Sequence, residues 1–585
     1  MTAASTPSLS AAGVPQGPRL ARLSRLAALP AGDRRLLRAM AAVALLALGL
    51  GLVGGLVTAL ARAGFIDLVP YSGYRYLTVH GVAIFFYWLF VAQCALLLAL
   101  AAAERGAGLA ARGWGWAGFA AMAGGFAVSL AGAHMGTPLL YDGSPELGAD
   151  LPAALLAVHG GYLLLALGLL LLPVAAIATL LAPTAAGVDA PAVDAHRPLS
   201  AVGFALFAWA GFLAVTGFAA LYTFSPGVLW ALGLGPFPQD HGTRWHIVFH
   251  NMHYLPLMAT VILWYVLVQA LTGVHSVFGE RFSKLVFAMY LVFVPPTSLY
   301  HMFLEPDLPG VVRVTGSLLS LFVSVPTLTA FLIIVASLEM HARAQGGGSA
   351  RSVFGWIRQL PWRHPAMAAI GVAVASMGAG LALAFVLIQS ELAPLLSDSF
   401  FVPGYFHFFT VGTVSLTLLA GFALVLPALG GRTPAWPALL RWLPWLVLAG
   451  VLVFGAAGVA AGYVGVPRRM IDVSYQGDAP ALWAPLMATM GIGALLMAVA
   501  LAAFAAGVAA SLWPRRESTT AMAVPAASRA LPTVDWGGSV LKPSAAWVGP
   551  LSVLLIVGAM VVFTALGFEL MQTLPIAASG GGHAH

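Results

Sequence analysis

The sequence predicts an all-α fold, a polytopic membrane helix bundle of about 13 transmembrane helices. Of its 585 residues, 60% are hydrophobic and only 8% are charged, and long apolar runs recur from one end of the chain to the other. Soluble globular domains carry about 25% charged residues, so this composition excludes that class. A helix needs about 20 apolar residues to cross a hydrocarbon core of about 30 Å, and the runs have that length.

Each predicted span is a predominantly apolar segment. Each is long enough to cross the membrane as one helix. In chain order the predicted spans are 40–61, 76–103, 114–134, 151–182, 199–223, 245–271, 284–304, 311–338, 365–389, 400–427, 438–464, 483–513 and 546–571.

The charges between the spans predict their orientation, because lysine and arginine collect in cytoplasmic loops. The N-terminal tail and every second loop are basic, which predicts a cytoplasmic N-terminus and an outside C-terminus. One outer loop departs from this rule because it carries Arg468 and Arg469. The basic loops hold Arg105 and Arg112, Arg197, Arg281 and Lys284, Arg343 to Arg363, Arg432 and Arg441, and Arg515 and Arg516.

The same reading predicts one membrane domain with short ends. Residues 1–38 are rich in Ala, Ser, Pro and Arg and lack the pattern of a cleavable signal, so we expect a cytoplasmic tail. Residues 39–572 form the predicted transmembrane domain, and 573–585 form a short exposed tail. The stretches 345–349 and 514–545 read as cytoplasmic linkers.

Composition also limits the partners and cofactors. The net charge of +7 does not indicate nucleic-acid binding, because basic residues in a membrane protein report loop topology. The single cysteine, Cys94, lies in an apolar run. One thiol excludes an internal disulfide, a cysteine-ligated zinc or iron–sulfur site, and a dinuclear copper centre built from two thiolates.

Three histidines and a tyrosine gather in the sixth predicted span. His246, His250 and Tyr254 recur at helical spacing on one face, and His253 lies near it. Polar groups are costly inside a membrane, and neutral imidazole is the commonest metal ligand. For a single such histidine, a structural role, as a polar contact between helices or at the membrane interface, is as well supported as a functional role. The cluster favours a functional site without naming its chemistry.

The predicted orientation brings histidines from several helices to one depth, in the outer third of the bilayer. We expect His80 and His407, on separate helices, to clamp one haem iron from both faces as a low-spin centre. The outer arginine pair is placed to hold anionic haem propionates. The histidines at this depth are His80, His250, His301 and His407, with His134 and His159 at similar depth.

A transporter with histidines in a proton relay is the alternative for a chain with so many spans. The sequence shows no internal repeat, and its apolar segments hold almost no Asp, Glu or Lys that could couple ions. Both observations favour the metal or haem reading.

Seven motifs, read in order, resemble subunit I of the haem–copper oxidase superfamily in its B-type branch, over residues 40–571. They include RYLTVHG ending at Gly81, His250-x-x-x-Tyr254 and His301 followed by MFLEPDLPG. The others are VPTLTAF with SLE at 337–339, FGWIRQLPW at 354–362, VPGYFHF at 402–408 and GVPRR at 465–469.

The resemblance implies a role for each matching residue. His80 and His407 would ligate a low-spin haem of b or a type, and Arg468 and Arg469 would pair with haem propionates. His250 and His301 would be copper ligands, and Tyr254 would supply a proton and an electron to bound dioxygen. Tyr265, Ser317 and Ser320 fall where this branch has a proton path of hydroxyl groups, although such hydroxyls also bond their own helix carbonyls.

The resemblance also implies the protein's setting. Such a subunit lies in the bacterial inner membrane and passes electrons from cytochrome c, through the low-spin haem, to a binuclear site that reduces dioxygen with proton translocation. Electrons would arrive from a subunit II that carries a dinuclear copper centre, or from a cytochrome c, on the outer face. Membrane lipid is the remaining expected partner.

Three positions around the second haem depart from the family pattern. The family has a pair of histidines where this chain has Tyr300 and His301, and it has histidine, the axial ligand of the high-spin haem, where this chain has Tyr405. The loop around Ser397 and Asp398 lacks a histidine and an aspartate that this branch uses near that haem's propionates.

The departures leave three readings open. In the first, Tyr405 binds a high-spin haem as tyrosinate, and copper or iron binds His250 and His301 with His246 or His253. In the second, only the low-spin haem remains, and the protein is an electron-transfer cytochrome or a partner subunit. In the third, the chain is a nitric-oxide-reductase relative, for which Glu305 is a poorly placed glutamate.

Overall fold

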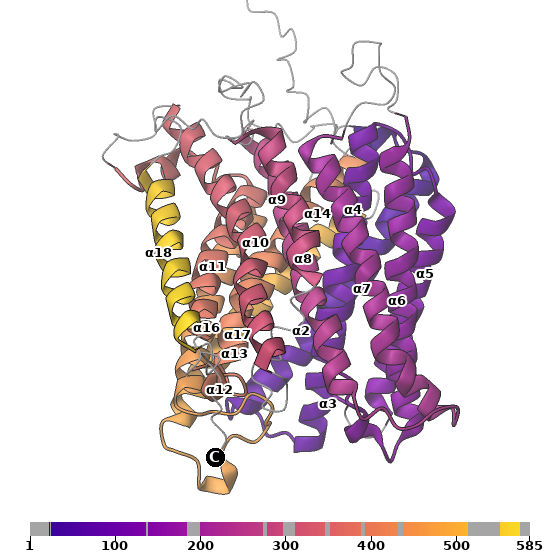
Figure 1. The fold of residues 1–585 in the computed structure, drawn as a ribbon, viewed down its shortest axis with the longest axis vertical. Helices are drawn as coiled ribbons and strands as arrows, with labels where there is room; N and C mark the ends of the chain where they lie inside the picture. The colour runs from indigo at the N-terminus through magenta and orange to yellow at the C-terminus, as the bar shows by residue number, and fades with distance from the viewer. Residues whose placement is uncertain are drawn as a thin grey trace, which may run out of the picture.

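The computed structural model is a bundle of long helices that run roughly side by side (Figure 1). Within the part of the chain that the structure describes, the only pairing outside helices and loops is an isolated bridge between Ser399 and Pro467. The described residues are 23, 25–135, 139–183, 199–272, 278–295, 310–344, 352–387, 392–430, 437–512 and 550–573.

The helices coincide with the predicted spans but differ from them at some ends: α2 begins nine residues before 40, α7 ends eight residues after 223, and α9 ends eleven residues before 304. They are α2 Ala31–Arg62, α3 Pro70–Gly81, α4 Leu89–Arg105, α5 Arg112–His134, α6 Pro152–Leu181, α7 Ala201–Ala231, α8 His241–Thr272, α9 Gly279–Phe293 and α10 Gly310–Ala344. They continue with α11 Pro365–Leu387, α12 Ala393–Leu396, α13 Phe401–His407, α14 Leu416–Gly430, α15 Pro437–Leu440, α16 Leu443–Tyr463, α17 Trp483–Ala509 and α18 Pro550–Thr573.

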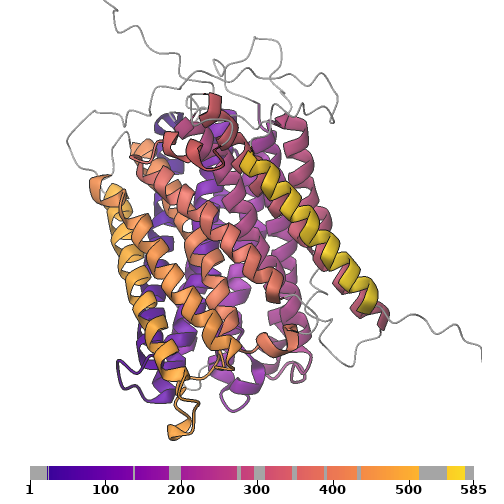
Figure 2. The same ribbon diagram turned by 90° about the vertical axis from the view of Figure 1, so that its left-hand side faces the viewer.

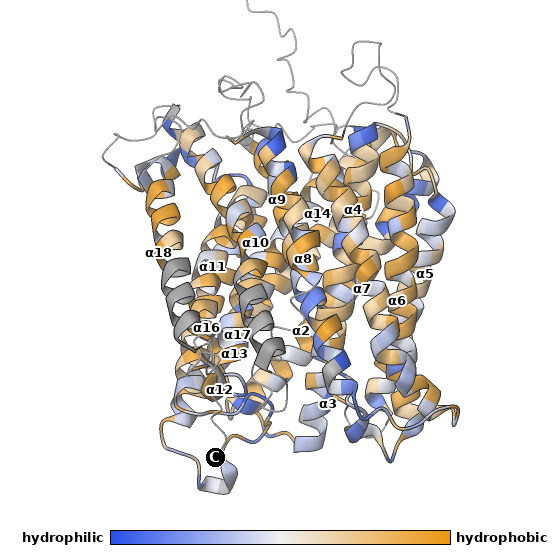
Figure 3. Cartoon of the chain, in the orientation of Figure 1, coloured by the Kyte–Doolittle hydropathy of each residue, from blue (hydrophilic) through white to orange (hydrophobic). Residues whose placement is uncertain are grey.

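The all-α membrane fold is confirmed. Within the described ranges, 11 helices are long and apolar enough to cross a membrane. The other two of the 13 expected spans correspond to α9 and α18, whose described lengths fall short of that criterion. Figure 3 shows the apolar colour along the helices and the hydrophilic colour gathered mainly toward the two ends of the bundle.

Three spans form the centre of the bundle. In the most apolar 18-residue stretch of Pro70–Arg105, 94% of the residues are buried. The corresponding share is 89% for both Arg244–Thr272 and Phe401–Gly430, and it is at most 67% for the other spans. These three spans carry His80, the histidines of α8, and His407. The helices that bear most of the predicted site residues are therefore the ones that the other helices surround.

Two of the central spans change helical form just after a predicted haem ligand. A π-helical segment, Val82–Trp88, joins α3 to α4, and a second, Phe408–Ser415, joins α13 to α14. His80 lies two residues before the first segment, and His407 directly precedes the second. π segments widen the helix by about one residue per turn and occur frequently at functional sites. Sequence patterns did not reveal them.

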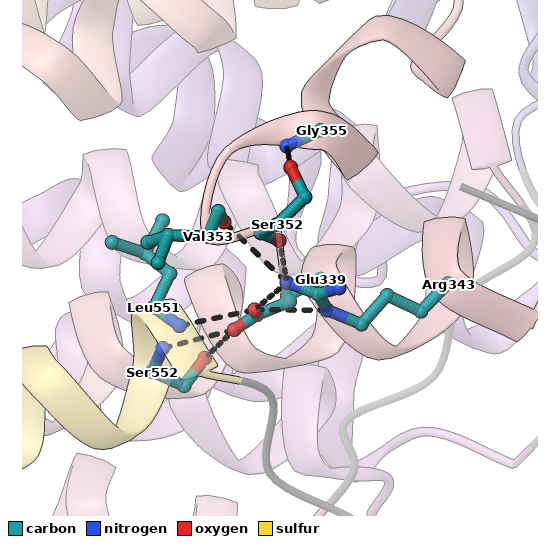
Figure 4. A network of polar contacts seen from close by, with 7 residues as sticks. All are labelled: Glu339, Arg343, Ser352, Val353, Gly355, Leu551 and Ser552. Carbon is teal, nitrogen blue, oxygen red and sulfur yellow. Dashed lines mark hydrogen bonds and ion pairs between the residues drawn. The ribbon is translucent and has the colours of Figure 1, made fainter. Parts of the chain in front are cut away.

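Helix α18 lies against α10 at the edge of the bundle (Figures 1 and 2). Its first turn is held by Glu339 of α10, a fully buried carboxylate (Figure 4). Glu339 accepts hydrogen bonds from the backbone N–H of Leu551 at 3.1 Å and from the N–H and hydroxyl of Ser552 at 2.9 and 2.6 Å. Arg343 donates to the same carboxylate at 2.8 Å. The carboxylate thus satisfies N–H groups that have no partner within α18.

Replacing Glu339 with alanine should lower stability by about 3–5 kcal/mol, because it removes the carboxylate that pairs with the buried charge of Arg343 and that accepts from the first N–H groups of α18. Glu339→Gln keeps an acceptor oxygen and should cost less. Thermal unfolding of the purified protein measures both, with the exposed Asp67→Ala as the control that should change little. Equal melting temperatures for Glu339→Ala and Asp67→Ala would contradict the anchoring role.

Candidate functional site

A partly open cavity of about 1070 Å³ lies among the central helices and extends to α18. Cavities for drug-sized ligands measure about 300–1,000 Å³, so this one has room for a large cofactor. Residues of α2, α3, α8, α10, α11, α13, α17 and α18 contribute to its wall. Tyr300 and His301, two of the predicted site residues, lie outside the described residues. The nine others all line the cavity: His80, His246, His250, His253, Tyr254, Tyr405, His407, Arg468 and Arg469.

The imidazoles of His80 and His407 lie parallel to each other in this cavity. Their ring centres are 6.5 Å apart, and their planes differ by 4°. An iron bound to both rings through nitrogens at about 2.0 Å would hold the ring centres roughly 6 Å apart. The pair therefore fits one iron held from two faces, the arrangement of a low-spin haem.

Backbone carbonyls fix which nitrogen of each ring is available. Nδ1 of His80 lies 2.7 Å from the carbonyl oxygen of Gly51, and Nδ1 of His407 lies 2.7 Å from that of Pro403. A carbonyl oxygen can only accept, so each Nδ1 donates its proton and Nε2 of the neutral ring keeps a lone pair. Metal-bound histidines usually donate their second nitrogen in this way, which fixes the ring orientation.

Glycines of α2 make room for His80. A Cβ atom on Gly55 would lie 2.5 Å from Nδ1 of His80, and one on Gly54 would lie 2.7 Å from the carbonyl oxygen of Tyr76. Only hydrogen fits at these positions. The close approach lets the Gly51 carbonyl reach the ring.

Small residues also set the place of His407, through the contact of α13 with α16. A Cβ on Gly404 would lie 2.6 Å from the backbone nitrogen of Val459, and one on Gly458 would lie 2.9 Å from Cα of Gly404. Such close backbone packing between small residues is common in membrane helix pairs. The ring of His407 packs on Phe454 of α16, with ring centres 4.4 Å apart.

Three arginines meet at one end of the cavity, called here the arginine end. Arg468 and Arg469 are the predicted pair, and Arg62, the last residue of α2, joins them. Arg62 donates to the backbone carbonyls of Met470 at 2.7 Å and Arg468 at 2.8 Å, and so fixes the loop that carries the pair. Three guanidinium groups at the cavity wall provide a site for anionic groups such as propionates.

Acidic and phenolic groups balance the arginine pair. Asp398 forms an ion pair with Arg468 at 2.8 Å, and Asp142 lies 3.8 Å from Arg469. Tyr141 also lines the cavity and is partly buried. Burial raises the pKa of the Tyr141 phenol, and the charge of Arg468 opposes that shift. The loop at 397–398, which departs from the family pattern, thus supplies a counterion to the arginine pair.

The stretch of α8 at 246–254 reaches the same cavity, but its histidines differ in surroundings. His250 is 2% exposed, and its ring centre lies 4.9 Å from that of Tyr254. Nδ1 of His253 lies 2.7 Å from the carbonyl oxygen of Phe249, and its ring packs on Phe249 and Phe406 with centres 3.9 and 4.7 Å away. His253 therefore has the same nitrogen available as His80 and His407, within an aromatic enclosure.

Tyr405 occupies the cavity wall one turn before Phe409. Its ring lies among the rings of Phe401, Phe406 and Phe409, with centres 6.0, 6.2 and 6.3 Å away. These aromatic rings surround the Tyr405 ring at the wall of the cavity.

Pairs of hydrogen-bonded hydroxyl groups lie between the helices α8, α9 and α10. The Tyr254 hydroxyl bonds Ser324, Tyr290 and Thr327 hydroxyls lie 2.9 Å apart, and the Tyr265 hydroxyl donates to Ser283 at 3.1 Å. Thr327 and Ser324 lie one turn apart on α10. The side chains of Ser317 and Ser320 lie outside the described part of the chain.

The structure separates some histidines that the sequence grouped. His134 is exposed at the end of α5 and does not line the cavity, and His159 belongs to a different buried cluster. Among the described residues, no three His, Cys, Asp or Glu side chains meet as a metal-binding group. A metal at His250 would therefore need a ligand from another source, such as His301 or a tyrosine.

Sequence reasoning missed Arg62, Asp142 and Tyr141. Arg62 had a usable signal, since an arginine at the outer end of an apolar span is unusual under the charge rule. Asp142 and Tyr141 had none, because their role depends on the placement of a loop.

Comparisons with known proteins agree with this picture. Residues 35–496 match the family model described as cytochrome c and quinol oxidase polypeptide I. The chain is 29% identical over 290 residues to cytochrome c oxidase subunit 1 of Thermus thermophilus, and this match covers 49% of the chain and 51% of that protein. The chain thus spans about half the length of the curated relative it matches. A cryo-EM structure of a haem–copper terminal oxidase dimer has the same fold, with a TM-score of 0.74, 18% identity and 94% coverage of both chains.

Proposed function

The chain belongs to the cytochrome c and quinol oxidase polypeptide I family, the subunit I family of haem–copper oxidases, and we propose that it works as subunit I of a respiratory terminal oxidase. The proposal places it in the B-type branch, where it passes electrons from cytochrome c to a site that reduces dioxygen with proton translocation. The family implies haem and copper cofactors.

The parallel pair of His80 and His407 carries the proposal. Their 6.5 Å ring separation and backbone-fixed Nδ1 protons support a single haem iron between two Nε2 atoms. When bound, a haem with two histidine ligands supplies reversible one-electron transfer. Arg468, Arg469 and Arg62 line the cavity and would hold the propionates of such a haem, and their positive charge would favour its reduced form.

The second centre of the proposed oxidase uses the α8 side of the cavity. His250 and His301 are the proposed ligands of copper or iron, together with Tyr300 and with His246 or His253. Tyr405 is the proposed ligand of a high-spin haem through its phenol oxygen. Tyr254 holds a proton beside His250. The hydroxyl pairs of Tyr254, Tyr290 and Tyr265 offer a chain of donors and acceptors through which protons reach that position.

A second function is favoured by one observation. Tyr405 replaces an imidazole, and the described residues hold no group of three metal ligands. A chain with only the low-spin haem would act in electron transfer, as a cytochrome or a partner subunit. A nitric-oxide-reductase role would need a glutamate at the metal, and Glu305 lies outside the described residues.

The proposed setting follows the family. The protein lies in the bacterial plasma membrane with its N-terminus in the cytoplasm, and residues 39–572 form its membrane domain. The arginine end then faces outward, where a subunit II with a dinuclear copper centre or a soluble cytochrome c delivers electrons.

A haem and metal count on the purified protein, with a carbon monoxide difference spectrum, tests the function. Two haems, one copper and carbon monoxide binding support the oxidase. One haem without carbon monoxide binding supports the electron-transfer role. A protein without haem would overturn both and revive the transporter.

A further inference from the structure

A buried hydrogen bond joins the two π segments of the central spans. Trp88 is the last residue of the segment Val82–Trp88, and Ser415 is the last residue of Phe408–Ser415. Nε1 of Trp88 donates to the Ser415 hydroxyl at 2.9 Å, and the two residues are 0% and 3% exposed. The roles proposed above for haem, metal and proton binding use neither side chain.

This hydrogen bond lies at the same distance along the chain from both predicted haem ligands. Trp88 is eight residues after His80, and Ser415 is eight residues after His407. At the rise of an α-helix, eight residues correspond to about 12 Å along each span. The spans are therefore linked at two levels, at the pair of imidazoles and again about 12 Å further along the helices. Two helices linked at two levels turn less easily relative to each other than two helices linked at one.

The π segments are the places where the spans bend most easily. The N–H of Leu89 bonds the carbonyl of Ile84, five residues earlier. The N–H of Leu416 bonds that of Val411, also five residues earlier. Each segment thus interrupts the regular hydrogen bonding of its helix, and helices bend where that pattern is interrupted. The hydrogen bond between the segments limits such bending in both spans at once.

The two imidazole planes are fixed by different helices. Nδ1 of His80 is held by the carbonyl of Gly51, which belongs to α2, whereas Nδ1 of His407 is held by that of Pro403 in its own helix, α13. The plane of His407 therefore follows the span Phe401–Gly430, while the plane of His80 follows the contact of α3 with α2. The 4° angle between the planes consequently depends on how the two spans lie relative to each other.

We propose that Trp88 and Ser415 are positioning residues for the low-spin haem, and that their hydrogen bond keeps the imidazole planes of His80 and His407 parallel. This inference rests on the haem ligation in the proposed function. Trp88 does not line the cavity, so it acts through the span that carries His80. Ser415 lines the cavity and receives the bond on the span that carries His407.

The starting angle fixes the direction of the expected effect. Parallel axial imidazoles give a rhombic low-spin signal in electron paramagnetic resonance, and the largest g value rises as one plane turns away from the other. Because the planes of His80 and His407 begin only 4° apart, a larger turn in either direction increases the angle. Loss of the Trp88–Ser415 bond should therefore shift the largest g value upward.

Electron paramagnetic resonance of the purified, oxidised full chain tests the proposal. Trp88→Phe keeps a ring against Phe422, whose ring centre lies 6.2 Å from that of Trp88, but removes the N–H donor. Ser415→Ala keeps the indole and removes the acceptor. Both variants should raise the largest g value, and the double variant should raise it no further than Trp88→Phe, because all three lose the same bond. A wild-type g value in Trp88→Phe would overturn the proposal, and so would a shift confined to Ser415→Ala.

Trp264→Phe is the matched control. Trp264 is also 0% exposed, and its Nε1 donates to the Thr417 hydroxyl at 2.9 Å. Thr417 is two residues after Ser415, but Trp264 comes from α8 and not from the span that carries His80. The control should lose a similar amount of thermal stability to Trp88→Phe and keep the wild-type g value. Equal g shifts in the two tryptophan variants would show a general loosening of the bundle and overturn the positioning role.

The wild-type protein separates this inference from the proposed function. A low-spin signal without carbon monoxide binding refutes the oxidase, while an upward shift in Trp88→Phe still supports the positioning role. A low-spin signal with carbon monoxide binding and no shift in Trp88→Phe refutes only the positioning role. A protein without a low-spin haem signal overturns both.

Discussion

Replacing His407 with alanine should abolish the low-spin haem absorbance of the purified protein. The substitution removes one of two parallel rings whose centres are 6.5 Å apart, and no other imidazole lies on α13. Loss of an axial ligand leaves the iron bound through His80 alone, which changes its spin state or releases it. Visible absorption and the pyridine haemochrome assay of haem content measure the two outcomes.

His134→Ala is the matched control for this prediction. Nδ1 of His134 also bonds the carbonyl four residues earlier, that of Leu130 at 2.8 Å, as Nδ1 of His407 bonds that of Pro403. His134 is exposed and does not line the cavity, so its removal should leave the spectrum unchanged. An unaltered low-spin spectrum in His407→Ala would show that the parallel pair does not hold the haem.

Much of the fold was predictable because the membrane constrains it. Long apolar segments must form helices there, since every backbone N–H and carbonyl needs a partner within the segment. The 13 apolar segments therefore located the helices, with errors of up to eleven residues at their ends. The two π segments were not predictable from hydropathy, because Val82–Trp88 and Phe408–Ser415 are as apolar as their neighbours.

The candidate site was likewise predictable only in part from the sequence. His80 and His407 stood out because polar residues are rare in apolar spans and because their motifs match the family. Their hydrogen-bond partners could not be inferred, since Gly51 is 29 residues from His80 in the chain and the contact depends on how α2 packs on α3. Depth in the membrane does not by itself identify a site residue. His134 was placed at a similar depth to the site histidines but is exposed, because residues at one depth can face away from the centre of the bundle.

Substituting Gly55 with alanine should detach His80 from the iron while the bundle stays folded. The new Cβ would lie 2.5 Å from Nδ1 and 2.7 Å from Cε1 of His80, closer than any real Cβ contact, so the ring must move. Movement breaks the hydrogen bond to the Gly51 carbonyl, which fixes the Nε2 direction. We expect a shift from a six-coordinate to a five-coordinate haem spectrum, with haem still bound through His407.

Gly49→Ala separates this steric effect from helix propensity. Gly49 lies in the same helix, and a Cβ there meets nothing within 4 Å. Alanine in place of glycine inside a helix favours the helix by about 0.5–1 kcal/mol, so both variants gain the same local preference. Gly49→Ala should keep the six-coordinate spectrum, and any loss of ligation in Gly55→Ala then comes from contact with His80. If the two variants have the same spectrum, the ring of His80 has room to spare and the close packing of α2 does not set its orientation.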